Sequence, residues 1–175
     1  MEKLKVYMIP HPKLRQKATP VDVIDDALCR LLDNMLHTMY ADNGVGLAGP
    51  QVGVAKRIIV MDMAEDHEPP DPHFIINPKI IWQSDETIVL PEACISIPGV
   101  YADVKRPKEV EVEYLDRHNR LQRVKADGYK GRCFQHEIDH LDGRTFLDHL
   151  PSLKRKLLLN KSIRHQKNLQ RTAEN

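Results

Sequence analysis

The sequence predicts an α+β fold in which antiparallel sheets surround a central helix, with one further helix toward each end of the chain. Three observations support this class. Apolar residues recur at helical spacing in residues 21–42, short strand-like runs follow between residues 56 and 126, and two more helical segments occupy residues 129–141 and 151–171. The order helix, strands, helix, helix indicates α+β.

The first predicted helix, residues 21–42, is amphipathic. Seven apolar residues fall on one face at spacings of three and four: Ile24, Leu28, Leu31, Leu32, Met35, Leu36 and Met39. Asn43 and Gly44 follow, and both residue types are common just beyond a helix end. We therefore expect the helix to stop there.

A glycine-rich stretch, GVGLAGPQVGV (44–54), comes next. Taken alone it is best interpreted as a flexible loop. It is not a phosphate-binding loop, because no Gly-Lys-Ser/Thr sequence follows. Residues 56–63 then predict a strand, and residues 66–73, which include three prolines, predict a loop.

Four short strands are expected at residues 74–82, 86–90, 100–106 and 109–116. The last begins a hairpin over residues 109–126 that turns at residues 116–119, because apolar and polar residues alternate on both of its arms. Residues 129–141 predict the central helix, which Gly143 stops. Residues 151–171 predict the last helix, which Pro151 and Ser152 begin.

Length and composition are those of a soluble globular domain, and we expect one domain over residues 1–175. No run of about 18 apolar residues predicts a membrane span, and the first ten residues lack the apolar core of a secretory signal. We expect a monomer in the bacterial cytoplasm, or in an organelle if a transit peptide has been removed. The three cysteines form no disulfide framework. Cys29 and Cys133 lie on predicted helices and are interpreted as packing residues.

The C-terminal segment is basic although the whole chain has a net charge of only +1. Residues 151–175 contain seven Lys or Arg and one Glu, a net charge of +6, so the remaining residues carry −5. A solvated helix face and an arm that binds a polyanion are about equally good interpretations.

The central helix contains the sequence His136-Glu137-x-x-His140. Residues four apart lie on one helix face, so both imidazoles can bind the same metal ion. A metal ion lowers the pKa of bound water toward neutrality, and Glu137 is placed to take the proton and pass it to a leaving amine. The alternative is a chance match in a salt-bridged helix.

A catalytic site of this kind usually has three protein ligands. Proteases related to thermolysin use a downstream glutamate, but the only glutamate after Glu137 is Glu174. Metzincins have a histidine where this chain has Phe146. We therefore expect the third ligand upstream. Cys94, which lies between predicted strands, is the best candidate because a thiolate binds zinc or ferrous iron strongly.

Three motifs, GVGLAGPQVG (44–53), EACIS (92–96) and QHEIDHLDG (135–143), together resemble those of the peptide deformylases. These metal-dependent hydrolases remove the formyl group from the N-formylmethionine of nascent bacterial and organellar polypeptides. The resemblance implies one divalent metal ion as cofactor, with Fe²⁺ as the physiological ion and Zn²⁺, Ni²⁺ or Co²⁺ as substitutes.

The resemblance also implies a role for each matching residue. Glu137 corresponds to the general acid/base. The side-chain amide of Gln51 and the backbone N–H of Ile95 correspond to the donors that stabilise the oxyanion. The metal ligands implied are Cys94, His136 and His140.

The substrate is expected to lie against the glycine-rich motif, where Gly44 and Gly46 let the backbone come close. An apolar pocket for the methionine side chain is expected from Val45, Leu90, Tyr129 and Cys133. Beside Cys94, Glu92 is expected either to orient a ligand histidine or to pair with Arg106. A surface salt bridge is the simpler alternative.

Two residues depart from the family pattern. Ala93 replaces a glycine, and its methyl group is expected to narrow the cleft or to shift the backbone. Gly49 replaces an alanine and is expected to loosen the first motif. Two rival functions are a general HExxH endopeptidase and an inactive relative that binds peptides or ribosomes. The basic segment and the resemblance together suggest that residues 151–175 dock on ribosomal RNA.

Overall fold

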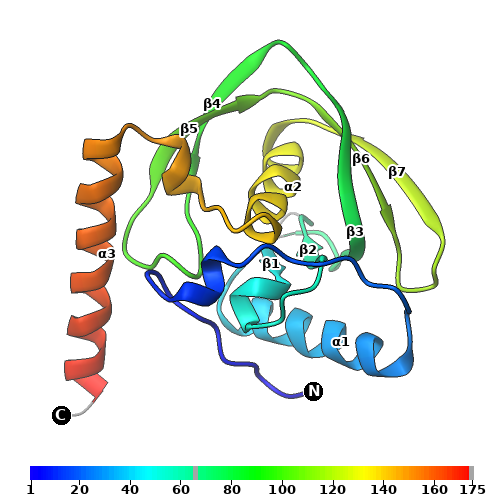
Figure 1. Cartoon of the computed structure of the whole chain (residues 1–175), viewed down its shortest axis with the longest axis horizontal. Helices are drawn as coiled ribbons and strands as arrows, with labels where there is room; N and C mark the ends of the chain where they lie inside the picture. The colour runs from blue at the N-terminus through cyan, green and yellow to red at the C-terminus, as the bar shows by residue number, and fades with distance from the viewer. Residues whose placement is uncertain (65–66, 174–175) are drawn as a thin grey trace.

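The computed structural model describes residues 1–64 and 67–173, and it confirms the predicted α+β class. A five-stranded antiparallel sheet has the order β1-β2-β3-β6-β7, and a separate antiparallel pair is formed by β4 and β5. Figure 1 shows α2 in the middle of the molecule, with α1 and α3 toward its outside. The helices are α1 (Asp26–Ala41), α2 (Gly128–Leu141) and α3 (Ser152–Ala173). The strands are β1 (Gly46–Ala48), β2 (Ile58–Asp62), β3 (Pro72–Gln83), β4 (Thr87–Glu92), β5 (Ala102–Pro107), β6 (Val110–Leu115) and β7 (Leu121–Ala126).

Helix α1 begins at Asp26, later than the predicted residue 21. The Asp25 carboxylate caps it by accepting a hydrogen bond from the backbone N–H of Leu28 at 2.8 Å. The helix ends at Ala41, and Asn43 then adopts a left-handed conformation with φ 53°. Its apolar face packs against one side of the larger sheet through Leu32, Met35 and Met39.

The predicted strands and the β6–β7 hairpin are all present, but two segments differ from expectation. The loop expected over residues 66–73 ends early, because β3 starts at Pro72, the first strand position, where a missing N–H is tolerated. Asp66 lies outside the described residues. The glycine-rich stretch is not a plain loop, since Gly46 pairs with Met61 in β1 and residues 49–52 form a short 3₁₀ helix, η2 (Gly49–Val52).

Helix α2 is exposed in its first turn, but every residue from Gly131 to Leu141 is buried. Phe134, Ile138 and Leu141 pack in one cluster with apolar residues of the five-stranded sheet. The helix ends before Gly143, whose φ of 72° favours glycine. Burial on every face means that polar side chains on α2 must find partners inside the protein.

Helix α3 packs against the rest of the protein through a few residues on one face. Leu158 and Leu159 pack against the apolar cluster around η3 (Phe146–His149), and Ser162 Oγ donates to the carbonyl oxygen of Pro98 at 2.8 Å. A Cβ at Gly99 would lie 2.5 Å from the ring of His165. The basic residues of this helix are all exposed: Lys154, Arg155, Lys156, Lys161, Arg164, Lys167 and Arg171. Among the described residues, no helix has the length and apolar character needed to cross a membrane.

Candidate active site and metal centre

The structure brings together the three side chains that the sequence suggested as metal ligands. Cys94 lies just beyond β4, whereas His136 and His140 lie one turn apart on α2. Their ligand atoms all lie within 4.8 Å of one another, and Cys94 Sγ is 3.3 Å from His140 Nε2. One thiolate and two imidazoles form a donor set suited to zinc or ferrous iron.

Each imidazole is arranged to present Nε2 to this cluster. His136 Nδ1 lies 2.9 Å from the Glu92 carboxylate, which leaves its Nε2 available. His140 Nε2 lies 3.3 Å from Cys94 Sγ, and burial lowers the pKa of this imidazole to about 3. These residues therefore fit a divalent metal ion.

Glu137 is almost completely buried beside the cluster, and its Oε2 has no hydrogen-bond partner among the described residues. Burial raises the pKa of Glu137 to about 7; nearby His136 opposes this shift and the charge of Glu92 adds to it. A Cβ at Gly46 would lie 2.6 Å from Glu137 Oε1, so the carboxylate sits directly against β1. A carboxyl group that titrates near neutrality can both accept and return a proton.

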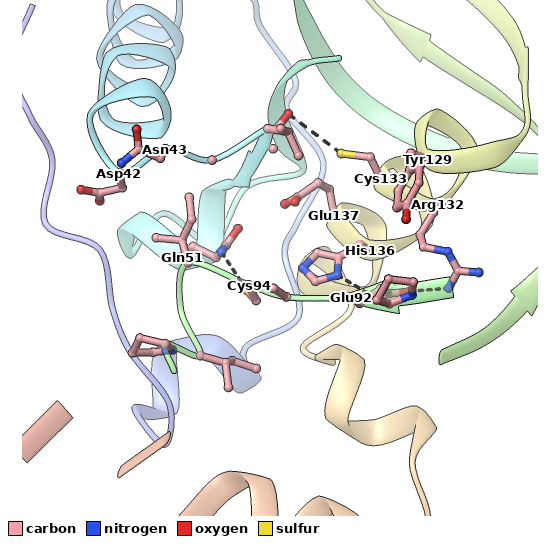
Figure 2. A pocket seen from close by; sticks show the side chains of 18 of the residues that line it. Asp42, Asn43, Gln51, Glu92, Cys94, Tyr129, Arg132, Cys133, His136 and Glu137 are labelled. Atoms are coloured by element: carbon pink, nitrogen blue, oxygen red, sulfur yellow. Dashed lines mark hydrogen bonds and ion pairs between the residues drawn. The ribbon is translucent and has the colours of Figure 1, made fainter. Parts of the chain in front are cut away.

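Gln51 is held with its amide group facing the second motif. Its Oε1 accepts a hydrogen bond from the backbone N–H of Ala48 at 2.8 Å. Its Nε2 donates to Ser96 Oγ at 3.1 Å. The same nitrogen lies 3.6 Å from Cys94 Sγ, as Figure 2 shows. Ser96, the last residue of the EACIS motif, is fully buried and was not expected at this site.

Glu92 makes both expected contacts at once, with His136 and with Arg106, and it does so in the interior. Arg106 donates to its two carboxylate oxygens at 2.6 and 2.9 Å, while His136 Nδ1 makes the contact described above. Although burial raises the pKa of Glu92, the hydrogen bonds from Arg106 and His136 hold it well below its ordinary value. The Glu92–Arg106 pair is therefore a buried ion pair, and the surface salt bridge alternative is wrong.

The buried network continues outward from Arg106. Its Nη1 donates to Asp139 Oδ2 at 2.7 Å, and the same oxygen lies 2.6 Å from His149 Nε2. Arg132 contacts Glu92 from the other side, with Nη1 2.7 Å from Oε1. Arg132 was not expected in this network, although its position four residues before His136 places it on the same helix face.

A cavity of about 410 Å³ opens in front of these groups. Figure 2 shows side chains from α2, among them Cys133, His136 and Glu137, on one side of it, with Gln51 and Cys94 on the other. The predicted residues that line it are Gly44, Val45, Gly46, Gln51, Glu92, Cys94, Ile95, Tyr129, Cys133, His136 and Glu137. Further lining comes from residues the sequence analysis did not select, including Met63 and residues 97–100.

The predicted pocket residues do not all take the expected place. Val45 and Tyr129 are more than half exposed and stand at the mouth, whereas Cys133 is buried within. The structure does not bring Leu90 to the cavity. Leu90 pairs with Val104 in the two-stranded sheet and lies two residues before Glu92, roughly 7 Å farther along the strand.

The structure corrects the expectation for Gly49. A Cβ at this position would lie 2.7 Å from the carbonyl oxygens of both Val54 and Lys56. The glycine therefore allows a closer backbone approach, and the motif is tighter here rather than looser. Ala93 is exposed and lines the cavity, so its methyl group does border the cleft.

Comparisons with known proteins agree with this geometry. A family model described as polypeptide deformylase matches residues 3–156. The peptide deformylase of Phenylobacterium zucineum is 44% identical over 163 residues, which cover 93% of this chain and 96% of that protein.

Two solved structures share the fold. The peptide deformylase of Ehrlichia chaffeensis in complex with actinonin has a TM-score of 0.87 at 41% identity and covers 92% of this chain and 96% of its own. A peptide deformylase from Legionella pneumophila has a TM-score of 0.91 at 36% identity and covers 97% of this chain and 98% of its own. The chain therefore belongs to the peptide deformylase family.

Proposed function

We propose a division of roles among the site residues for the reaction of this family, the metal-dependent removal of the N-formyl group from nascent polypeptides. The observation that carries the proposal is one cavity that combines three features. It is bordered by Cys94 and His136 of the cluster that also contains His140, by a carboxyl group with a pKa near 7, and by an oriented amide donor.

Cys94, His136 and His140 would hold one divalent ion, with Fe²⁺ as the proposed physiological metal and Zn²⁺, Ni²⁺ or Co²⁺ as substitutes. When bound, such an ion acidifies water and polarises a carbonyl group. The mixed sulfur and nitrogen donors support this choice, because magnesium and calcium prefer oxygen ligands.

Glu137 takes the proton of the attacking water and delivers it to the amine that leaves when the formyl C–N bond breaks. The Glu137 carboxylate, which carries this proton, lies against Gly46 of β1. Negative charge that develops on the formyl oxygen is stabilised by Gln51 Nε2 and by the backbone N–H of Ile95. A glutamine suits this role because its amide donates hydrogen bonds without titrating.

The methionine side chain enters the cavity past Val45 and Tyr129 and approaches Cys133. The two residues at the mouth are exposed, so the rest of the peptide can leave toward solvent. This arrangement supports a peptide substrate whose N-terminal methionine binds in the cavity while its later residues remain in solvent.

Turnover of formyl-Met-Ala by anaerobically prepared protein, with metal analysis of the same sample, tests the proposal. Glu137→Gln is expected to lower turnover by about 10²- to 10⁴-fold with metal content unchanged. Glu86→Gln, at an exposed residue, serves as the matched control and is expected to retain wild-type turnover. Cleavage of an internal peptide without deformylation would contradict the proposal. So would full activity of Glu137→Gln.

We further propose that the exposed basic side of α3 docks on ribosomal RNA, which would place the enzyme beside nascent chains in the cytoplasm. Seven exposed Lys and Arg residues on one helix support binding to phosphates. The test is ribosome binding over a range of salt concentrations for the triple variant Lys161→Ala, Arg164→Ala, Lys167→Ala. It is expected to bind more weakly and with a smaller salt dependence.

The matched control for this experiment removes three exposed positive charges elsewhere: Lys79→Ala, Lys105→Ala and Arg120→Ala. It is expected to bind like the wild type. Equal binding by the α3 variant and the wild type at every salt concentration would contradict the docking proposal and leave the catalytic one intact.

A further inference from the structure

Arg132 is a buried cation in the wall of the active-site cavity. It lies on α2, one turn before His136, and is only 4% exposed. Its Nη1 donates to Glu92 Oε1 at 2.7 Å and to the carbonyl oxygen of Val104 at 2.8 Å, and its Nη2 donates to the carbonyl oxygen of Ile88 at 3.0 Å. One guanidinium group thus contacts β4, β5 and the carboxylate that holds His136. Figure 2 shows the contact between Arg132 and Glu92.

These contacts matter because the cluster of ligand atoms is divided between two parts of the fold. Cys94 follows the two-stranded β4–β5 sheet, whereas both histidines lie on α2, which packs against the five-stranded sheet. The distance between the thiolate and the imidazoles therefore depends on how the smaller sheet is fixed to the helix. Arg132 spans this junction, since its stem belongs to α2 and its terminal nitrogens bind the backbone of both strands.

The charges around Arg132 show that it is held inside a paired network. Two buried cations, Arg106 and Arg132, alternate with two buried carboxylates, Glu92 and Asp139. The Nε of Arg132 is buried without a partner among the described residues. The side chain is thus placed where Glu92 and the strand carbonyls require it, at the expense of its own hydrogen bonding.

We propose that Arg132 is a positioning residue that sets the spacing between Cys94 and the two histidines by fastening β4 and β5 to α2. The proposal rests on the metal-dependent function given above. A lysine cannot replace it, because a single ammonium group does not reach the carboxylate and two separate carbonyl oxygens with the fixed geometry of a guanidinium.

The test uses Co²⁺-loaded protein and the variants Arg132→Lys and Arg132→Met. Lys130→Ala, at an exposed residue two positions earlier on α2, is the matched control. The measurements are the visible and near-ultraviolet spectrum of Co²⁺, the rate of Co²⁺ release to a chelator, and the steady-state kinetics with formyl-Met-Ala. Circular dichroism and thermal unfolding establish that each variant is folded.

For both Arg132 variants we expect Co²⁺ release at least about tenfold faster than in the wild type, a size typical of lost outer contacts to metal ligands. The Co²⁺ spectrum should change and kcat should fall more than KM, whereas Lys130→Ala should match the wild type in every measurement. A folded Arg132→Lys variant with wild-type spectrum and release rate would overturn the proposal, even if Arg132→Met does not fold. Wild-type protein that binds Co²⁺ but does not deformylate would instead contradict the proposed function.

Discussion

Glu92 and His136 are joined by a 2.9 Å hydrogen bond between Oε2 and Nδ1, deep in the interior. This contact leaves the other imidazole nitrogen free to face Cys94, and it places an ionised carboxylate directly behind a proposed metal ligand. The expected effect is a more basic and better oriented histidine.

The first prediction follows from this contact. Glu92→Gln keeps the side-chain size but removes the negative charge that faces two arginines and His136. Metal affinity, measured by competition with a chelator, is expected to fall by about 10- to 100-fold. Glu86→Gln controls for the loss of one carboxylate at an exposed position. Unchanged affinity in Glu92→Gln would show that the contact does not support the metal site.

The second prediction concerns the close approach of Gly46 to Glu137. A Cβ at residue 46 would lie 2.6 Å from Oε1, so Gly46→Ala is expected to destabilise the protein by about 1–3 kcal/mol and to displace the carboxylate. Because Glu137 causes the clash, the same substitution should be less destabilising in a Glu137→Ala background. Urea unfolding of the four proteins measures this coupling. An equal loss of unfolding free energy from Gly46→Ala in both backgrounds would show that Glu137 does not cause the clash.

The third prediction compares the two departures from the family pattern. Gly49→Ala introduces the alanine that the family resemblance leads one to expect but places a methyl group 2.7 Å from two backbone carbonyl oxygens. We expect a loss of about 1–3 kcal/mol in the free energy of unfolding. Ala93→Gly likewise introduces the glycine that the resemblance leads one to expect, but at an exposed position, and should change stability by less than about 1 kcal/mol. The idea fails if Gly49→Ala is as stable as the wild type.

The fourth prediction is a pH dependence that arises away from the metal site. Asp148 accepts hydrogen bonds from Arg15 at 2.5 Å and from the Thr145 backbone at 2.7 Å. Burial raises the pKa of Asp148, but these contacts outweigh burial and lower it. With the folded pKa below the unfolded value of about 4, the stabilisation is present above that value. It is lost as the pH falls through the folded pKa.

Asp148→Asn should therefore cost about 1–3 kcal/mol near pH 6 and progressively less toward pH 2. Denaturant unfolding at a series of pH values measures the difference. Asp103→Asn, at an exposed residue of β5, controls for the loss of one surface carboxylate. A cost that is constant with pH would refute the assignment.

The parts of the fold that could be predicted from the sequence are those that depend on local patterns. Helical periodicity located α1 and α3, and the i, i+4 spacing predicted that His136 and His140 lie on one face of α2. The missing third ligand downstream directed attention to Cys94, which the structure places beside both histidines. Each of these inferences needed only neighbouring residues or a motif.

The parts that could not be predicted depend on pairing between distant segments. The short strand β1 exists because Gly46 pairs with Met61, and no local pattern specifies that register. Arg132 gains its importance from carbonyl groups of two strands that lie 28 and 44 residues earlier. The tight packing of Gly49 likewise depends on the path of residues 54–56, which the sequence does not reveal.

The contact of α3 with residues 98 and 99 has a practical consequence for experimental design. Deleting the C-terminal helix is the obvious way to test ribosome binding, but it would also remove the Ser162 hydroxyl from Pro98 and the His165 ring from Gly99. Pro98 and Gly99 both line the active-site cavity. A truncated protein would therefore confound delivery to the ribosome with catalysis, whereas neutralising exposed charges separates the two.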